Sequence, residues 1–272
     1  MVVLHSMRLP NPEELSNPDQ LTLWRYDSVE YFAPDCSSRS VLYHRQLDLN
    51  LRLATALSRN GWLLDVGCAQ GNVTTLLAHG GVNSVGIDIR RSFLEYARVK
   101  DGHGAADFIA SNAYKLPVRS SSIGCIVANQ LFEHLADLER LMSEFGRVLE
   151  RGGNLLIATP NHDAILQKLP NYREFKSGGV RRGNVIAECG PDGKDHLFLF
   201  TMAELEEFLE LFGFEIIESR MHSNLVFNWC SCRMIPRHWR PRFLLLLDKV
   251  LGMNERTKRL LMRQILIHAR KL

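Results

Sequence analysis

The stretch "LLDVGCAQGNVTTLL", residues 63–77, joins an apolar run that ends in an acid to a segment with helical spacing. Asp65 is the acid, and the small residues Gly67, Ala69 and Gly71 follow it at every second position. Small residues let a ligand approach the backbone closely, and a carboxylate attracts a positively charged group. The stretch therefore predicts a loop that binds a ligand carrying an ammonium group.

Two common nucleotide-binding loops fit this stretch less well. The dinucleotide fingerprint requires a small residue at position 72, where this chain has Asn72. The Gly-Lys-Ser/Thr ending of a P-loop does not follow the glycines either. A ligand with an ammonium group and no phosphate fits better, and S-adenosylmethionine is such a ligand. Ala69 is compatible with this loop if its backbone φ is negative.

The elements around the loop alternate between two periodicities. Short apolar runs predict strands at 61–67, 83–89, 106–111, 123–129, 153–160, 214–219 and 264–271. Helical spacing of apolar residues predicts helices at 72–80, 91–100, 135–150 and 201–213. This alternation predicts an α/β fold, a parallel sheet with helices on both faces. Ligands of such sheets bind at the carboxyl ends of the strands, where residues 67–71 are expected to lie.

Composition and charge limit the function classes. The chain has 272 residues, of which 46% are hydrophobic, enough for a sizeable core. Its apolar runs are far shorter than the ~20 residues of a membrane span, and its N-terminus has no signal-peptide pattern, so we expect a cytoplasmic protein. The segment from Arg233 to Leu272 contains eleven Lys or Arg residues but only two acidic residues. Such a tail suits nucleic acid, anionic lipid or an acidic substrate, although a solvated helix face is commoner.

Five stretches in order resemble the class I S-adenosylmethionine-dependent methyltransferases, in particular the type 11 group that includes ubiquinone-biosynthesis-like O-methyltransferases. They are "LLDVGCAQG", "VGIDIRRSFLEYAR", "NAYKLPVRSSSIGCIVANQLFEHL", "LERLMSEFGRVLERGGNLLIATPN" and "DHLFLFTMAELEEFLELFGFEII". The resemblance implies a Rossmann-like, seven-stranded, mostly parallel sheet with helices on both faces and an antiparallel last strand. It also implies a helical lid at 1–60, a methyltransferase core at 61–222, a basic amphipathic insert at 223–263 and a final core strand at 264–272.

The resemblance assigns each cofactor contact to a position in this chain. The methionine end is assigned to Asp65 and the three small residues, and the ribose hydroxyls to Asp88, which ends the second strand. The adenine and the sulfonium are assigned to the residues that follow later strands. In chain order the assigned residues are Asp65, Gly67, Ala69, Gly71, Asp88, Ile89, Asn112, Ala113, Asn129 and Gln130. Asn112 stands where the family usually has Asp, but an amide oxygen can still accept the adenine amino proton.

Three histidines are candidates for the catalytic base. Methyl transfer requires a base only when the acceptor carries a proton that must leave, as a hydroxyl does. Histidine suits that task near neutral pH. His134, His162 and His196 are all expected at the carboxyl edge of the sheet. His134 and His196 match positions that recur in the family and rank first, although Glu133-His134 could instead begin a helix and shape the pocket.

The acceptor is narrowed by motifs that the chain lacks. After the fourth strand it has "NQLFEH" rather than the Asn/Asp-Pro-Pro motif of base amino-methylating enzymes, so nucleic acid is not the expected partner. Asp163 is the one obvious acid at the carboxyl edge, so no metal is expected. The favoured function is methyl transfer to a hydroxyl oxygen of a small-molecule, lipid-linked or glycan acceptor. The alternatives are a nucleic-acid or protein methyltransferase that uses the basic tail, and a catalytically silent scaffold.

The basic tail also suggests a peripheral contact with the inner membrane surface through residues 233–260. Helical spacing places Phe243, Leu244, Leu247, Val250 and Leu251 on one stripe, with basic residues on its flanks. Apolar burial combined with basic flanks binds anionic membrane interfaces. The simpler interpretation is a helix that packs on the protein core.

Overall fold

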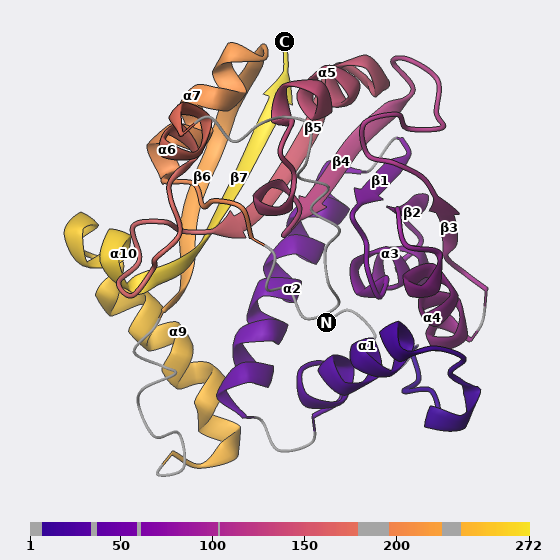
Figure 1. Ribbon diagram of the computed structural model, residues 1–272. Coiled ribbons are helices and arrows are strands. Elements are labelled where there is room, and N and C mark those ends of the chain that lie inside the picture. Colours follow the sequence, from indigo (N-terminus) through magenta and orange to yellow (C-terminus); the bar gives the residue numbers. More distant parts are fainter. Residues whose placement is uncertain (1–6, 34–36, 59–60, 103, 179–195, 225–234) are drawn as a thin grey trace.

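The computed structural model describes residues 7–33, 37–58, 61–102, 104–178, 196–224 and 235–272. Its centre is a seven-stranded sheet with the order β3-β2-β1-β4-β5-β7-β6 (Figure 1). The strands are β1 Leu63–Val66, β2 Ser84–Asp88, β3 Asp107–Ala110, β4 Ile123–Asn129, β5 Leu149–Pro160, β6 Phe214–Asn224 and β7 Met262–Lys271. β7 runs antiparallel to both of its neighbours, and the other pairings are parallel. The fold class expected from the sequence is confirmed.

Helices cover both faces of this sheet (Figure 1). They are α1 Pro18–Val29, α2 Ser38–Leu57, α3 Asn72–His79, α4 Arg91–Asp101, α5 Leu138–Val148, α6 Tyr172–Ser177, α7 Met202–Leu211, α9 Arg240–Leu251 and α10 Glu255–Leu261. Short 3-10 turns are η1 Pro12–Glu14, η2 Phe132–His134 and η4 Arg237–Trp239. α7 begins where the sequence predicts, because Thr201 accepts from the Glu204 amide and Glu204 accepts from the Thr201 amide.

The core is divided between the two faces of the sheet. On one face, α5, α6 and α7 pack apolar side chains such as Phe145 and Phe208 against β4, β5 and β7. On the other face, α2 and α3 contribute Leu47, Leu51 and Leu76 to a second cluster. α2 lies within the predicted N-terminal lid, and its buried leucines make it part of the core as well.

Element boundaries differ modestly from the predictions. β6 continues to Asn224, five residues beyond its predicted end at 219, because β7 pairs with it along most of its length. α5 ends at Val148 rather than at 150, because Leu149 already pairs with Ile123 of β4. Each shift follows from strand pairing between distant segments, which local periodicity does not report.

α9 is packed on the protein by one side. Leu244 is buried against Val41 of α2, and Phe243 and Leu247 lie partly buried beside them. Asp248 lies 4.0 Å from Arg45 of α2 and accepts a hydrogen bond from Asn224 of β6. The predicted apolar stripe is therefore divided between contact with α2 and solvent, since Val250 is 54% exposed. Among the described residues, no helix combines the length and the apolar character that a membrane crossing requires.

Candidate functional site

The loop between β1 and α3 is built on left-handed backbone conformations. Gly67, Ala69 and Gly71 have φ angles of 76°, 44° and 72°. A Cβ on Gly67 would lie 2.9 Å from Leu131, and one on Gly71 would lie 2.7 Å from Phe108, so both positions require glycine. Ala69 therefore does not meet the condition of a negative φ under which the sequence made it compatible with this loop. The Ala69 amide donates to the Asp88 carboxylate at 3.0 Å, a bond that helps to hold this strained conformation.

The two acids predicted to bind the ligand also organise the loop. Asp65 is buried and accepts from the Thr74 amide at 3.2 Å and from the Thr74 hydroxyl at 2.6 Å, which ties β1 to α3. Burial raises the pKa of Asp65 to about 6. Asp88 accepts from the Ala69 amide and, at 2.9 Å, from the Arg90 amide. Burial also raises the pKa of Asp88. Each acid thus joins the end of a strand to the segment that follows.

A cavity of about 340 Å³ opens beside this loop, at the carboxyl ends of β1 and β4. The sheet order reverses between these two strands, which is where α/β sheets bind ligands. The residues that line it are Glu30, Tyr43, Gln46, Leu47, Asp65, Gly67, Cys68, Ala69, Gln70, Asn72, Val73, Asn129 and Gln130. The structure therefore brings the predicted residues of β1, its loop and the end of β4 around one space.

The remaining predicted cofactor residues are not among those that line the cavity. Gly71 caps α3, and Ile89 follows Asp88 with 66% of its surface exposed. The Ser111 amide donates to the Asp88 carbonyl at 3.0 Å, which holds the end of β3 next to the end of β2. The exposed Asn112 accepts from the Tyr114 amide at 2.9 Å, so its amide oxygen already closes a turn. Ala113 packs against the core beside it.

The sequence predicted a helical lid at residues 1–60, but it did not single out the residues of this segment that line the cavity. Glu30, which caps α1, and Tyr43 and Gln46 of α2 all line it. Gln46 and Asn50 donate to the Asn129 side-chain oxygen at 3.2 and 3.1 Å. Burial raises the pKa of Glu30 and of Tyr43. The available signal was the spacing of polar positions 43, 46 and 50, which places them on one face of a helix.

A buried polar network surrounds Asn72, the residue that follows Gly71 of the loop. Lys100 of α4 and Asp27 of α1 form an ion pair at 2.8 Å, and both side chains are 0% exposed. Tyr96 and Asn72 donate to the same carboxylate at 3.0 and 3.1 Å, and Asn72 also contacts Lys100 and Tyr43. A buried pair of charges is stable only when its hydrogen bonds are completed in this way. The network therefore fixes α1 and α2 relative to the cavity.

A second polar cluster lies just beyond β4. Glu133 and His134 belong to η2, and the Leu197 amide donates to the Glu133 carbonyl at 2.8 Å, which brings His196 alongside. One ligand atom of each of these three side chains lies within 4.8 Å of the others. The two imidazole rings meet edge to face with centroids 4.7 Å apart. The two histidines that ranked first in the sequence are thus neighbours in the structure.

Glu133 is the unexpected member of this cluster. Its side chain is 0% exposed, one carboxylate oxygen accepts from the Thr159 hydroxyl at 2.9 Å, and burial raises the pKa of Glu133 to about 7. The other oxygen is buried without a hydrogen-bond partner in the described part of the chain. His162, the third candidate, lies apart from this trio and is 3.7 Å from Asp163.

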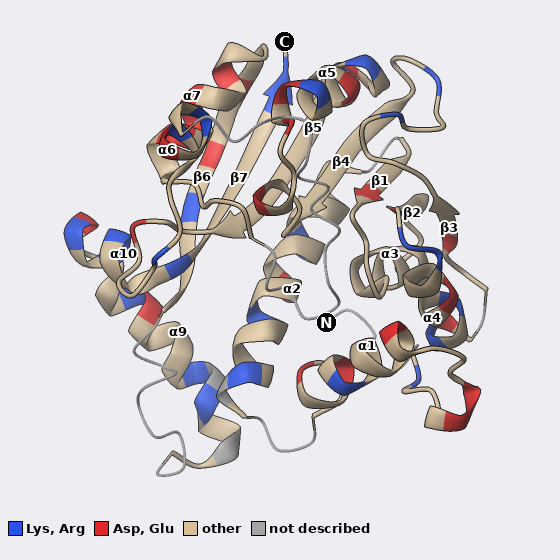
Figure 2. Cartoon of the chain, in the orientation of Figure 1, with Lys and Arg blue, Asp and Glu red and all other residues tan. Residues whose placement is uncertain are grey.

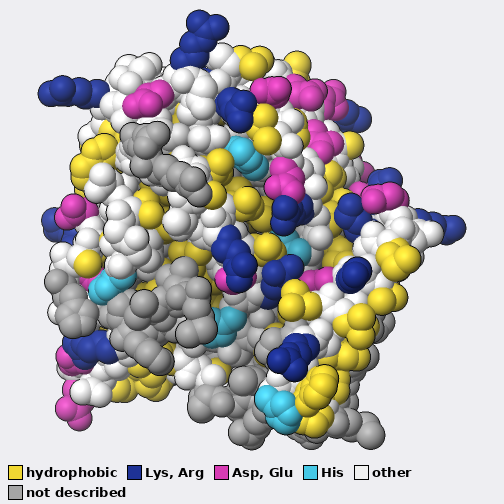
Figure 3. Space-filling view, turned by 180° about the vertical axis from the view of Figure 1, so that it is seen from behind, with side chains coloured by type: hydrophobic (Ala, Val, Ile, Leu, Met, Phe, Trp, Pro, Cys, Tyr) yellow, Lys and Arg dark blue, Asp and Glu magenta, His cyan; other side chains and the backbone are white. Residues whose placement is uncertain are grey.

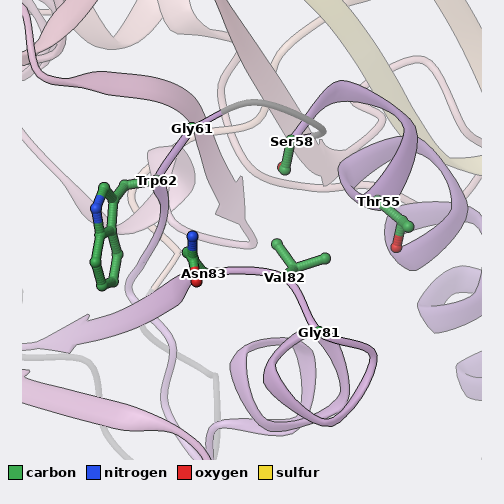
Figure 4. A pocket seen from close by; sticks show the side chains of 7 residues that line it. All are labelled: Thr55, Ser58, Gly61, Trp62, Gly81, Val82 and Asn83. Carbon is green, nitrogen blue, oxygen red and sulfur yellow. The ribbon is translucent and has the colours of Figure 1, made fainter.

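A larger cavity, of about 510 Å³, lies at the opposite, amino ends of β1 and β2 (Figure 4). Its lining consists of Thr55, Ser58, Gly61, Trp62, Gly81, Val82 and Asn83. These residues include no Asp, Glu, His, Lys, Arg, Cys or Tyr, and the rule for open α/β sheets places ligands at the other, carboxyl ends of the strands. The smaller cavity at the glycine loop is therefore the candidate functional site.

Comparison with known proteins shows what the central region is similar to. Residues 64–157 match the family model described as a methyltransferase domain. A probable S-adenosylmethionine-dependent methyltransferase of Mycolicibacterium smegmatis is 29% identical over 163 residues, which cover 58% of this chain and 63% of that protein. A ubiquinone biosynthesis O-methyltransferase of Mesorhizobium japonicum is 28% identical over 101 residues, covering 36% of this chain and 41% of that protein. The chain thus spans less than two thirds of the length of these relatives.

Solved structures share the fold over most of the chain. A magnesium protoporphyrin IX methyltransferase of Synechocystis, solved with bound SAH, superposes with a TM-score of 0.56 at 15% identity, covering 94% of this chain and 95% of that one. A SAM-dependent methyltransferase of Archaeoglobus fulgidus gives the same TM-score and identity over 84% of this chain and 94% of that one. At such identity these neighbours establish the Rossmann-like fold.

Proposed function

Because residues 64–157 match the family model of a methyltransferase domain, we propose that the protein binds S-adenosylmethionine and transfers its methyl group to an acceptor. The observation that carries this proposal is the cavity where the strand order reverses, bordered by the loop that Asp65 and Asp88 hold in place. This proposal is favoured over a catalytically silent scaffold because the loop, both acids and the neighbouring histidines occur together.

The cofactor's methionine end fits the cavity. Glu30 and Asp65 line it and supply negative charge for the ammonium group, while Gly67 and Ala69 leave room for close approach. Asn129 and Gln130 also line the cavity, and we propose that the sulfonium lies beside them. α1 and α2 contribute lining residues and are proposed to act as a cover over the bound cofactor, as expected for residues 1–60.

The adenosine end extends along the ends of β2 and β3. Each oxygen of Asp88 accepts one backbone amide and keeps a second lone pair for a ribose hydroxyl. The exposed Ile89 offers an apolar surface to the adenine ring, and Asn112 and Ala113 lie at its edge. The second lone pair of the Asn112 amide oxygen remains available for the adenine amino group.

We assign acceptor activation to His134 and His196. His134 follows the pocket residue Gln130 by four positions, and His196 lies beside His134, so an acceptor hydroxyl next to the two rings would face the methyl group. The transfer forms an oxygen–methyl bond, breaks the sulfur–methyl bond and releases the hydroxyl proton. Positioning supplies much of the rate, and proton removal supplies a further part. The proposed acceptor is a small molecule, a lipid-linked molecule or a glycan.

Calorimetric titration with S-adenosylmethionine tests the proposal at its first step. We expect saturable binding with one site per chain. Incubation of a cell extract with the protein and isotopically methyl-labelled cofactor should then label an extractable acceptor, identified by mass spectrometry. Absence of cofactor binding would overturn the proposal, and binding without any labelled product would favour the scaffold instead.

We also propose a peripheral membrane contact through α9, η4 and α10, within residues 233–260. Positions 233 and 234 lie outside the described residues. The solvent side of this segment is strongly apolar: Trp239, Leu245, Leu246, Val250 and Met253 are between 46% and 82% exposed. In the view from behind, hydrophobic side chains form a band at the lower right, where α9 lies, with Lys and Arg beside it (Figure 3).

Charge complementarity favours an anionic bilayer as the occupant of this surface. Arg242 is exposed and stacks over the Trp239 ring at 5.6 Å, and Lys249 and Arg256 are also exposed. Basic residues occur on both α9 and α2, which pack side by side (Figure 2). Tryptophan and arginine side chains of this kind suit a membrane–water interface. A lipid-linked acceptor would reach the cofactor from the same surface.

Vesicle co-sedimentation tests this contact. We expect the protein to sediment with vesicles of phosphatidylglycerol and phosphatidylcholine at low salt, and to be released as salt rises, because each basic residue near the surface adds about 1 kcal/mol. Leu246→Glu with Val250→Glu should abolish sedimentation, whereas Leu211→Glu, on the exposed part of α7, should not. If the protein sediments with neither anionic nor neutral vesicles, the contact is refuted. Salt-sensitive binding to polynucleotide alone would point to nucleic acid.

A further inference from the structure

We infer that Glu133, His134 and His196 form a binding site for one divalent transition-metal ion, such as Zn²⁺ or Mn²⁺. The binding site stands on geometry alone, and only its role in the reaction rests on the proposed function. The sequence had suggested no metal, because Asp163 was the one obvious acid at this edge of the sheet. The structure instead assembles a donor set of two imidazoles and one carboxylate.

The geometry suits an ion of this kind. One donor atom of each of the three side chains lies within 4.8 Å of the others. Donor atoms around a zinc ion are roughly 3.3 Å apart, because the bonds are ~2.0 Å long, so small side-chain rotations would close the site. Two histidines and a glutamate are the protein ligands of zinc sites that keep a position open for substrate. Imidazole nitrogens favour zinc and other transition metals over Mg²⁺ and Ca²⁺.

The buried carboxylate is an independent observation. Glu133 is 0% exposed, and its second oxygen has no hydrogen-bond partner among the described residues. An unpaired buried carboxylate oxygen is costly, and a metal ion would satisfy it. The Thr159 hydroxyl donates to the first oxygen at 2.9 Å, which fixes the orientation of the carboxylate. Ligands are commonly held by such supporting hydrogen bonds.

An ion at this place would act on the acceptor. A hydroxyl bound at its open position would lose its proton to solvent more readily, because the ion stabilises the oxyanion that forms. The oxyanion would then take the methyl group, as the sulfur–methyl bond breaks. The two imidazoles would hold the ion, and neither would need to be the proton acceptor itself.

Metal content tests the inference without any need for the acceptor. The protein is stripped with a chelator, dialysed against Zn²⁺ or Mn²⁺, and its bound metal is measured by mass spectrometry. We expect about one ion per chain, and at least tenfold weaker binding for Glu133→Gln and for His196→Ala. His162→Ala is the matched control, since this histidine lies at the same sheet edge outside the trio, and it should bind metal like the unaltered protein.

Two results would overturn the inference: an unaltered protein that takes up no ion, or variants that bind it equally well. Titration with S-adenosylmethionine on the same stripped and loaded samples keeps the two proposals separate. Metal uptake with no cofactor binding supports the metal site and refutes only the proposed function. Cofactor binding with no metal uptake refutes the metal site and leaves the proposed function standing.

Discussion

Asp88→Ala is expected to lower the affinity for S-adenosylmethionine by about 100-fold or more. The carboxylate is proposed to accept both ribose hydroxyls, and hydrogen bonds to a charged group contribute roughly 1.5 to 3 kcal/mol each. The same side chain holds the amides of Ala69 and Arg90, so its removal also loosens the loop beside the cavity. Isothermal titration with the cofactor measures the loss.

Asp88→Asn and Asp107→Asn separate these effects. The first keeps one oxygen acceptor but no charge, so we expect an affinity between those of Asp88→Ala and the unaltered protein. Asp107 is exposed on the neighbouring strand β3, and its variant should bind normally. Circular dichroism spectra confirm that all three variants fold. An unchanged dissociation constant for a folded Asp88→Ala protein would remove Asp88 from the cofactor site.

His134→Ala and His196→Ala are each expected to lower turnover on the true acceptor while leaving cofactor affinity within about twofold. Removal of a group that assists proton departure costs roughly 10² to 10⁴ in rate. The two rings lie together beyond β4, whereas the cavity lining includes neither of them. We therefore expect turnover to fall in each variant while the dissociation constant for the cofactor stays nearly unchanged.

His162→Ala serves as the comparison for this pair, and it should retain nearly full turnover. Full activity in both His134→Ala and His196→Ala would show that the acceptor needs neither imidazole. A loss of cofactor binding in either variant would mean instead that the cluster supports the cavity. His134 is buried and His196 is only partly buried, so the His196 variant gives the cleaner measurement.

Local sequence patterns sufficed for the strands, the main helices and the glycine loop. Strand and helix periodicities depend on neighbouring residues, so β1, β4 and α7 lie where their patterns predict. Two boundaries differ from the prediction. β6 is longer because it pairs with β7, and α5 ends earlier because Leu149 pairs with β4. The positive φ of Ala69 has a similar cause, because the side chain of Asp88, 19 residues away, holds the Ala69 amide.

The sequence by itself determined the fold class and the nature of the ligand loop, because an acid, two glycines and alternating periods act over short stretches of chain. Only the tertiary structure decided what surrounds that loop. Glu30, Tyr43 and Gln46 enter the cavity through the packing of α1 and α2, and Lys100 reaches Asp27 across 73 residues. Glu133 and His134 meet His196 because the backbone near Leu197 pairs with η2. Helical spacing puts positions 43 and 46 on one face of α2, but which elements meet that face depends on how the elements pack.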